Sequence, residues 1–190
     1  MIHDISRRAA GMLGNQLEAD KEQTDIFAYG LEIIIGGVVK FALVVLLAYI
    51  FGILETTLIS VAAFIVFRHF GGGVHLSTYA RCLSLGLLLF LTMGKLAVYD
   101  IHTKIIIGLL SVIFFLGIYI IIKWVPAGTQ KKNISCKDLR SKQKLKAFIA
   151  LIVWMILNAI LIYHRQIQYG FALILGATGS FFFISPLGYR

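Results

Sequence analysis

The chain has 190 residues, of which 59% are hydrophobic and only 14% are charged, and its formal net charge is +9. Its mean hydropathy is +0.88. A soluble domain carries about 25% charged residues, so this composition excludes an ordinary soluble protein. We expect an all-α integral membrane protein, with residues 1–190 forming a single membrane domain and no room for a second one.

The N-terminal segment, residues 1–30, is expected at the cytoplasmic membrane interface. Apolar residues recur there every three or four positions, which predicts a short amphipathic helix. These residues are Ile2, Ile5, Ala9, Leu13 and Leu17. Such a helix either lies along the membrane surface or forms a solvated cap on the bundle. Because the segment has charged residues and no long apolar core, we expect no cleavable secretory signal.

The apolar runs predict about six transmembrane helices. As a single helix, the run 31–67 would reach about 55 Å, whereas the hydrocarbon core of a bilayer is about 30 Å thick. We therefore expect a helical hairpin over 31–67 that turns near Gly52. Two further spans are expected in 83–122 and two in 148–185.

The basic residues orient these spans. The loop 123–147 carries eight lysines and arginines, whereas the loops 100–104 and 164–167 carry one each. By the positive-inside rule the basic loop 123–147 is cytoplasmic. Two spans separate it from residues 68–82, so that segment is expected at the cytoplasmic face of the cell membrane as well.

The segment 68–82 contains the side chains that most suggest chemistry. His75 and Cys82 follow three consecutive glycines, Gly71 to Gly73, between two apolar segments. An imidazole beside a thiol creates a nucleophile, because it can accept the thiol proton. On a continuous helix the two residues would be about 10.5 Å apart along the axis. Pairing therefore requires the chain to bend, which the glycines permit.

Simpler interpretations of these residues stay open. Cys82 at the start of a span suits a small apolar filler, and His75 suits a polar residue that snorkels to the interface. Arg68 is either an anchor for lipid phosphate or a cation that stabilises a thiolate or an oxyanion. A metal site would need a fourth ligand besides His69, His75 and Cys82. We expect no metal and no other cofactor.

The motif Arg-x3-Gly-Gly-x-His-x6-Cys resembles the signature of the accessory gene regulator B family, the membrane cysteine endopeptidases of Gram-positive quorum sensing. Here it runs from Arg68 through Gly72, Gly73 and His75 to Cys82. The resemblance covers the whole chain, including the polar N-terminal segment, the hairpin, the lysine-rich loop and the last two spans. It implies that Cys82 is the nucleophile and His75 the general base, later the general acid.

The same resemblance implies a precursor signalling peptide as substrate. Cys82 would attack a peptide bond near the C-terminus of the precursor and form an acyl-thioester. A cysteine or serine of the precursor would then displace Cys82 and close a thiolactone or lactone ring. Arg68, Gly72 and Gly73 match the family's motif positions in this catalytic loop, 68–82. No third catalytic group is obvious, and Ser77 is one candidate to orient His75.

The lysines of the basic loop allow two interpretations. Lys142, Lys144 and Lys146 either set topology and attract anionic lipid or dock an acidic precursor tail. The small-residue run 176–180 suggests a helix–helix contact, within one chain or between two copies of a homodimer. The expected partners are thus the precursor peptide, the lipid bilayer and a second copy of the chain, and no nucleic acid.

Lys40 and Lys95 fall inside predicted spans, where ionisable residues are often functional. Lys95 is near enough to a span end to snorkel, whereas Lys40 needs a partner, either Glu32 or a residue on another span. A small transporter, with these lysines lining a path, is the alternative to a peptidase. A non-enzymatic membrane partner is another alternative. Neither would depend on the thiol of Cys82, and a transporter often shows internal repeats, of which none is clear here.

Overall fold

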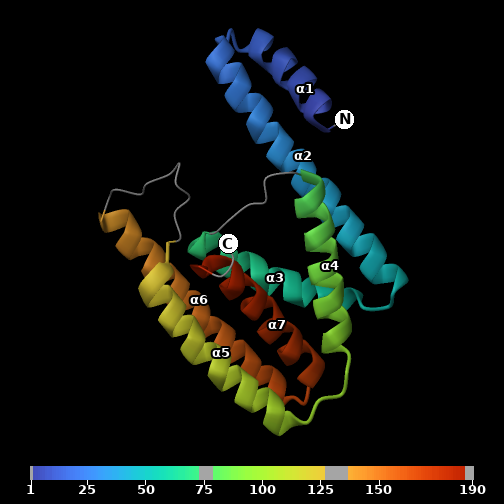
Figure 1. The fold of residues 1–190 in the computed structure, drawn as a ribbon, viewed down its shortest axis with the longest axis vertical. Coiled ribbons are helices and arrows are strands. Elements are labelled where there is room, and N and C mark those ends of the chain that lie inside the picture. Colours follow the sequence, from blue (N-terminus) through green and yellow to red (C-terminus); the bar gives the residue numbers. More distant parts are fainter. Residues whose placement is uncertain (1, 73–78, 127–136, 187–190) are drawn as a thin grey trace.

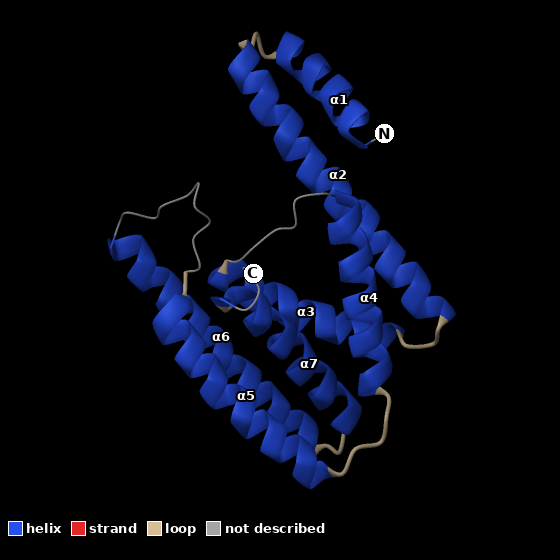
Figure 2. Ribbon diagram, in the orientation of Figure 1, coloured by secondary structure: helices blue, strands red, loops and turns tan. Residues whose placement is uncertain are grey.

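The protein was analysed as a computed structural model, which describes residues 2–72, 79–126 and 137–186. Over these residues the chain forms seven α-helices and no strand (Figures 1 and 2). The helices are α1 (Ile2–Gln16), α2 (Lys21–Ile50), α3 (Leu54–Gly71), α4 (Tyr79–Ala97), α5 (Thr103–Trp124), α6 (Lys137–Tyr163) and α7 (Ile167–Ile184). Six of them, α2 to α7, are long and apolar enough to cross a membrane. The predicted all-α membrane fold with six spans is therefore confirmed.

Helices α3, α5, α6 and α7 form a packed bundle, and α4 connects this bundle to α2 (Figure 1). Helix α7 contacts α3, α4, α5 and α6, and it is the most buried of the six spans. Aromatic rings fill the core around it: Phe67 packs on Phe181 and Trp154 with ring centroids 4.8 and 6.0 Å apart. Helix α2 is the least buried span and projects with α1 away from the bundle (Figure 1).

Small residues set the distance between α7 and α3. A Cβ added at Gly176 would overlap the backbone carbonyl oxygen of Ser60, so the two helices approach with backbone in contact. The Ser60 hydroxyl donates a hydrogen bond of 3.0 Å to the carbonyl of Ala172 on α7. Close approach through small residues is typical of helix pairs in membranes. The predicted contact of the 176–180 run is thus made within one chain.

Helix α1 is amphipathic, as expected, but its buried face consists of small residues. Ser6, Ala10 and Gly14, spaced by four, are buried against α2. Ile5 and Leu13 are instead 48% and 40% exposed. A capping box between Asp20 and Gln23 begins α2 and closes this hairpin. The two placements expected for α1, along the membrane surface or as a solvated cap, both stay predictions.

Two predicted loops are shorter than expected, because helices extend into them. Helix α3 continues through Arg68 to Gly71 and α4 begins at Tyr79, so Arg68 and Cys82 lie in helices instead of a loop over 68–82. Similarly, α6 begins at Lys137, well inside the predicted loop 123–147, and therefore includes the three candidate docking lysines. The reason is that hydropathy detects only the part of a helix that lies in hydrocarbon. The helix itself continues beyond that part through charged residues.

Successive helices run in opposite directions, so the connections between them lie alternately at two ends of the molecule. The short turns after α2, α4 and α6 lie at one end, and the last turns of α3, α5 and α7 lie at the other (Figure 1). This second end carries Arg68, Arg81, Lys123 and the basic start of α6. The basic end of the bundle is thus also the end at which Cys82 is found.

The close α3–α7 packing makes a first prediction. Gly176→Ala forces the two backbones apart, and overpacking of this kind costs about 1–3 kcal/mol, so we expect a lower midpoint of thermal unfolding in detergent. Gly108→Ala on α5 is the matched control, because a Cβ there meets nothing within 4 Å. Equal thermal stability of the two variants would contradict the assigned packing.

Candidate active site

Cys82 lies one turn into α4, on the face that meets α2. Residues Cys82, Gly86 and Phe90 are spaced by four, so they form one stripe along this helix. Gly86 and Phe90 are buried, whereas Cys82 is half-buried and has a free thiol. The stripe therefore leads from the packed interior to a thiol at the basic end of the molecule.

A complementary stripe on α2 faces it. Gly36, Lys40, Val44 and Ala48 are also spaced by four, and all except the half-buried Lys40 are buried. Tyr79 fixes the start of α4 against this stripe, because its hydroxyl donates a hydrogen bond of 3.2 Å to the carbonyl oxygen of Gly36. A Cβ at Gly36 would lie 2.7 Å from the Tyr79 ring, so only glycine leaves room for this contact.

Lys40 is the polar residue that α2 presents to Cys82. Its Nζ lies 3.7 Å from the Sγ of Cys82, within hydrogen-bond distance for sulfur. The same ammonium group lies 5.9 Å from the ring centroid of Phe90. The sequence left two partners open for Lys40, namely Glu32 or a residue on another span. In the structure its partner is Cys82 on α4, whereas Glu32 contacts Nδ1 of His3 at 3.1 Å.

Arg68 is held by a different helix pair. In the last turn of α3, its guanidinium donates a hydrogen bond of 3.1 Å to the carbonyl oxygen of Phe183 on α7 and lies 5.7 Å from the Phe183 ring centroid. These contacts join the ends of α3 and α7, whereas Cys82 belongs to the α2–α4 pair (Figure 1). The chemical role expected for Arg68 stays a prediction.

Gly72 ends α3 in a conformation that favours glycine. Its φ is +72°, in the left-handed region, and its amide donates a hydrogen bond of 3.0 Å to the carbonyl of Arg68. The expected base His75, together with Gly73 and Ser77, lies outside the described residues. The His75–Cys82 pairing therefore stays a prediction, and so does the contribution of Ser77.

The candidate docking lysines differ from one another. Lys142 and Lys146 are exposed on one face of α6. Lys144 is half-buried, and its Nζ donates a hydrogen bond of 2.7 Å to the carbonyl oxygen of Ile122 near the end of α5. Cations near a helix C-terminus are stabilised by the unpaired carbonyls there. Lys144 therefore joins α5 to α6, and only the other two lysines are free to meet a ligand.

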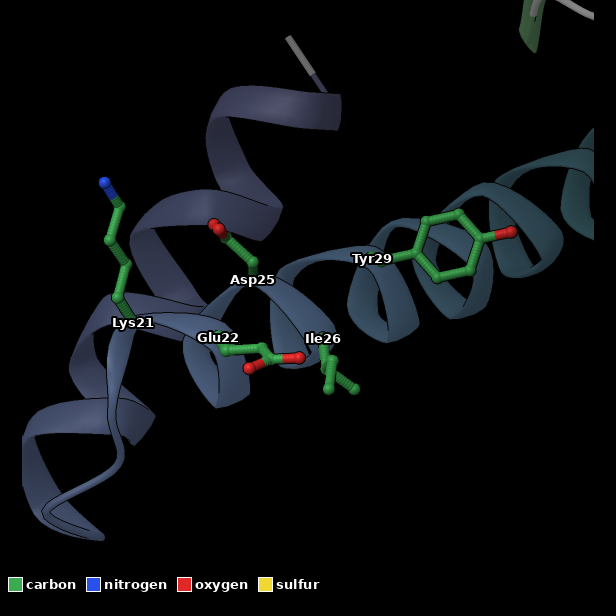
Figure 3. Close-up of a pocket in the computed structure, with 5 residues that line it drawn as sticks. All are labelled: Lys21, Glu22, Asp25, Ile26 and Tyr29. Atoms are coloured by element: carbon green, nitrogen blue, oxygen red, sulfur yellow. The ribbon is translucent and has the colours of Figure 1, made fainter.

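A hollow on the first turns of α2 does not resemble an active site. Its lining residues are Lys21, Glu22, Asp25, Ile26 and Tyr29. All are exposed, and they spread along a single helix instead of converging on one point (Figure 3). Elsewhere in the described part of the chain, no group of three or more His, Cys, Asp or Glu side chains is arranged to hold a metal ion.

Fold and site together define a multi-pass membrane protein with a thiol beside a cation at its basic end. The model of the family "Accessory gene regulator B" matches residues 6–185. The chain therefore belongs to the accessory gene regulator B family, and membership implies a role in the accessory gene regulator system of quorum sensing, where the family acts with a precursor peptide.

Individual relatives agree with this assignment. A putative AgrB-like protein 2 of Clostridium perfringens (strain 13) is 26% identical over 172 residues, which cover 87% of this chain and 80% of that protein. Accessory gene regulator protein B of Staphylococcus aureus (strain MRSA252) is 27% identical over 127 residues, which cover 67% of this chain and 66% of that protein. A putative AgrB-like protein of Listeria monocytogenes is 26% identical over 190 residues, which cover 98% of this chain and 89% of that protein. No solved structure matches this chain significantly.

The α2–α4 contact can be tested with a short bifunctional thiol reagent in a Cys136→Ala background. Lys40→Cys should be joined to Cys82 within one chain, because the native side chains meet there. Val39→Cys is the control, since its side chain is 37% exposed and points away from the buried stripe. Mass spectrometry of the digested protein detects the linked peptides. Equal linking of both variants would contradict the arrangement.

Proposed function

We propose that this protein is a membrane cysteine endopeptidase that cleaves a precursor signalling peptide and promotes cyclisation of the product. The observation that carries the proposal is the placement of Cys82: a half-buried free thiol at the basic end of the bundle, with an ammonium group 3.7 Å from its sulfur. Nearby cations favour the thiolate, which is the nucleophilic form of cysteine. Family membership supplies the context of peptide-based quorum sensing.

In the first half-reaction, the imidazole of His75 accepts the thiol proton of Cys82, and the sulfur attacks the carbonyl carbon of a peptide bond near the precursor's C-terminus. The C–N bond then breaks, and His75 gives its proton to the leaving amine. The products are the released C-terminal tail and an acyl-thioester on Cys82.

In the second half-reaction, a cysteine or serine of the precursor attacks the thioester carbonyl and expels the Cys82 thiolate, which closes the ring. Exchange of one thioester for another is nearly neutral in free energy, so this step needs no ATP. Forming the thioester from an amide is uphill, so removal of the tail or the ring draws the reaction forward. A site at the membrane end of a bundle also limits hydrolysis of the acyl-enzyme by water.

We place the site at the cytoplasmic face of the membrane. Arg68, Arg81, Lys123 and the lysines of α6 gather at the end of the bundle that carries Cys82, and an excess of basic residues is typical of cytoplasmic loops. The exposed pair Lys142 and Lys146 is then available to an acidic precursor tail on the same side.

The peptidase proposal is tested by reconstitution in liposomes with the precursor peptide from the same gene neighbourhood. We expect Cys82→Ala to abolish cleavage and His75→Ala to slow it about 10²- to 10⁴-fold, the usual contribution of a general base. Cys136→Ala should cleave at the wild-type rate. Mass spectrometry quantifies the released tail. Wild-type cleavage by Cys82→Ala would overturn the proposal and favour a transporter or a non-enzymatic partner.

The docking role is tested by reversing the two exposed lysines. Lys142→Glu with Lys146→Glu should raise the KM for the precursor several-fold, and the effect should shrink at high salt because exposed charges are screened. Lys104→Glu with Arg165→Glu, two exposed residues at the opposite end of the bundle, is the control matched for net charge. Lys144 is left intact because it joins α5 to α6. An unchanged KM for the double variant would contradict docking at this face.

A further inference from the structure

Lys40 occupies a position that ordinary packing does not explain. It lies in the apolar part of α2, in the buried stripe between Gly36 and Val44. Ionisable residues inside a membrane are unfavourable unless they find a partner, and they commonly mark a functional site. Among the described residues, the Sγ of Cys82 is the hydrogen-bond acceptor of its ammonium group, and no carboxylate forms an ion pair with it.

The opposite helix is shaped to receive this side chain. A Cβ at Gly86 would overlap Cε and Nζ of Lys40, so the ammonium group fills the space that glycine leaves on α4. One turn further along, the Phe90 ring lies beneath the charge, with its centroid 5.9 Å from Nζ, and such contacts stabilise cations. Gly86 and Phe90 therefore line one side of the ammonium group, and Cys82, one turn before Gly86, contacts it.

The other titratable groups near this contact have different partners. The Tyr79 hydroxyl donates to the carbonyl oxygen of Gly36, and Glu32 contacts His3. Arg81, next to Cys82 on α4, is exposed to the surroundings. From α3, Arg68 extends toward Phe183 on α7. Lys40 is thus the charged group of the described chain that contacts the sulfur directly.

We propose that Lys40 is a catalytic residue: its ammonium group stabilises the Cys82 thiolate in both half-reactions. The inference deepens the proposed peptidase function and rests on it. Lys40 exchanges no proton in this scheme, because the thiol proton goes to His75. A fixed charge in surroundings of low dielectric acts more strongly than the same charge in water.

The second half-reaction gains from the same contact. When the precursor's own nucleophile attacks the thioester, the electron pair of the broken C–S bond returns to the Cys82 sulfur. A thiolate that is stabilised by a neighbouring cation leaves faster. Lys40 therefore supports both the attack that opens the peptide bond and the expulsion that closes the ring, and its loss should slow ring closure as well as cleavage.

The test uses the reactivity of Cys82 itself, which does not depend on any peptide substrate. In a Cys136→Ala background, the rate of alkylation by iodoacetamide is measured at neutral pH for the full-length protein in liposomes. We expect Lys40→Met to slow this alkylation about tenfold, because the cation beside the sulfur is lost. Lys40→Arg should keep most of the wild-type reactivity.

Gly86→Ala provides an independent variant that keeps the charge. Its methyl group displaces Nζ from the sulfur, so its alkylation should be slowed as in Lys40→Met. Lys95→Met is the matched control, because this lysine of the same helix lies near Phe51 and Thr92, away from Cys82. A wild-type alkylation rate for folded Lys40→Met, or for folded Gly86→Ala, overturns the inference.

The outcome is separable from that of the peptidase proposal. If Cys82→Ala still cleaves the precursor but Lys40→Met slows alkylation, the peptidase proposal fails and the thiolate contact stands. If Cys82→Ala is inactive and Lys40→Met alkylates normally, the peptidase proposal stands and Lys40 has no role in the chemistry.

Discussion

The contact between α2 and α4 is the interaction on which the candidate site depends. Gly36 admits the Tyr79 ring and Gly86 admits the end of Lys40, so each helix supplies a glycine for a long side chain of the other. These two contacts bring an ammonium group to the sulfur of Cys82. A Cβ at either glycine would overlap the side chain that it admits, and at Gly86 it would move the ammonium group away from the thiol.

This contact lies at the edge of a more rigid structure. Helix α7 is surrounded by α3, α4, α5 and α6 and is fixed by backbone contact at Gly176. At the basic end of the bundle, Arg68 on α3 donates a hydrogen bond to the carbonyl oxygen of Phe183 on α7, so these two helices are in contact there as well. Helix α2, by contrast, is the least buried span. The protein thus combines a firmly packed centre with a candidate site formed against its most exposed helix.

Much of the fold could be predicted from the sequence, because hydrocarbon thickness imposes a simple length rule on apolar segments. The six spans and the turn near Gly52 follow from it, and Gly52 indeed has a left-handed φ of +66°. The helix ends could not be predicted in this way, since Lys137 and Lys142 continue α6 outside the apolar run. The amphipathic pattern of α1 was recognisable, but not that Ser6 and Gly14 would form its buried face.

The site itself was only partly predictable. The motif indicates Cys82, but the partner of Lys40 is 42 positions away in the sequence, and such a pairing depends on how two spans pack. A signal for it was present: Gly36, Lys40 and Val44 on one span, and Cys82, Gly86 and Phe90 on another, share a spacing of four. The carbonyl that binds Arg68 carried no such signal, because every residue has one.

The central claim, that Cys82 forms an acyl-enzyme, is tested most directly by trapping that species. A precursor whose ring-forming residue is replaced by alanine can be cleaved but cannot be cyclised. Incubated with the reconstituted protein, it should leave an adduct with the mass of its N-terminal fragment on Cys82, and hydroxylamine should remove this adduct. Release of the C-terminal tail without any adduct on Cys82 would contradict the account.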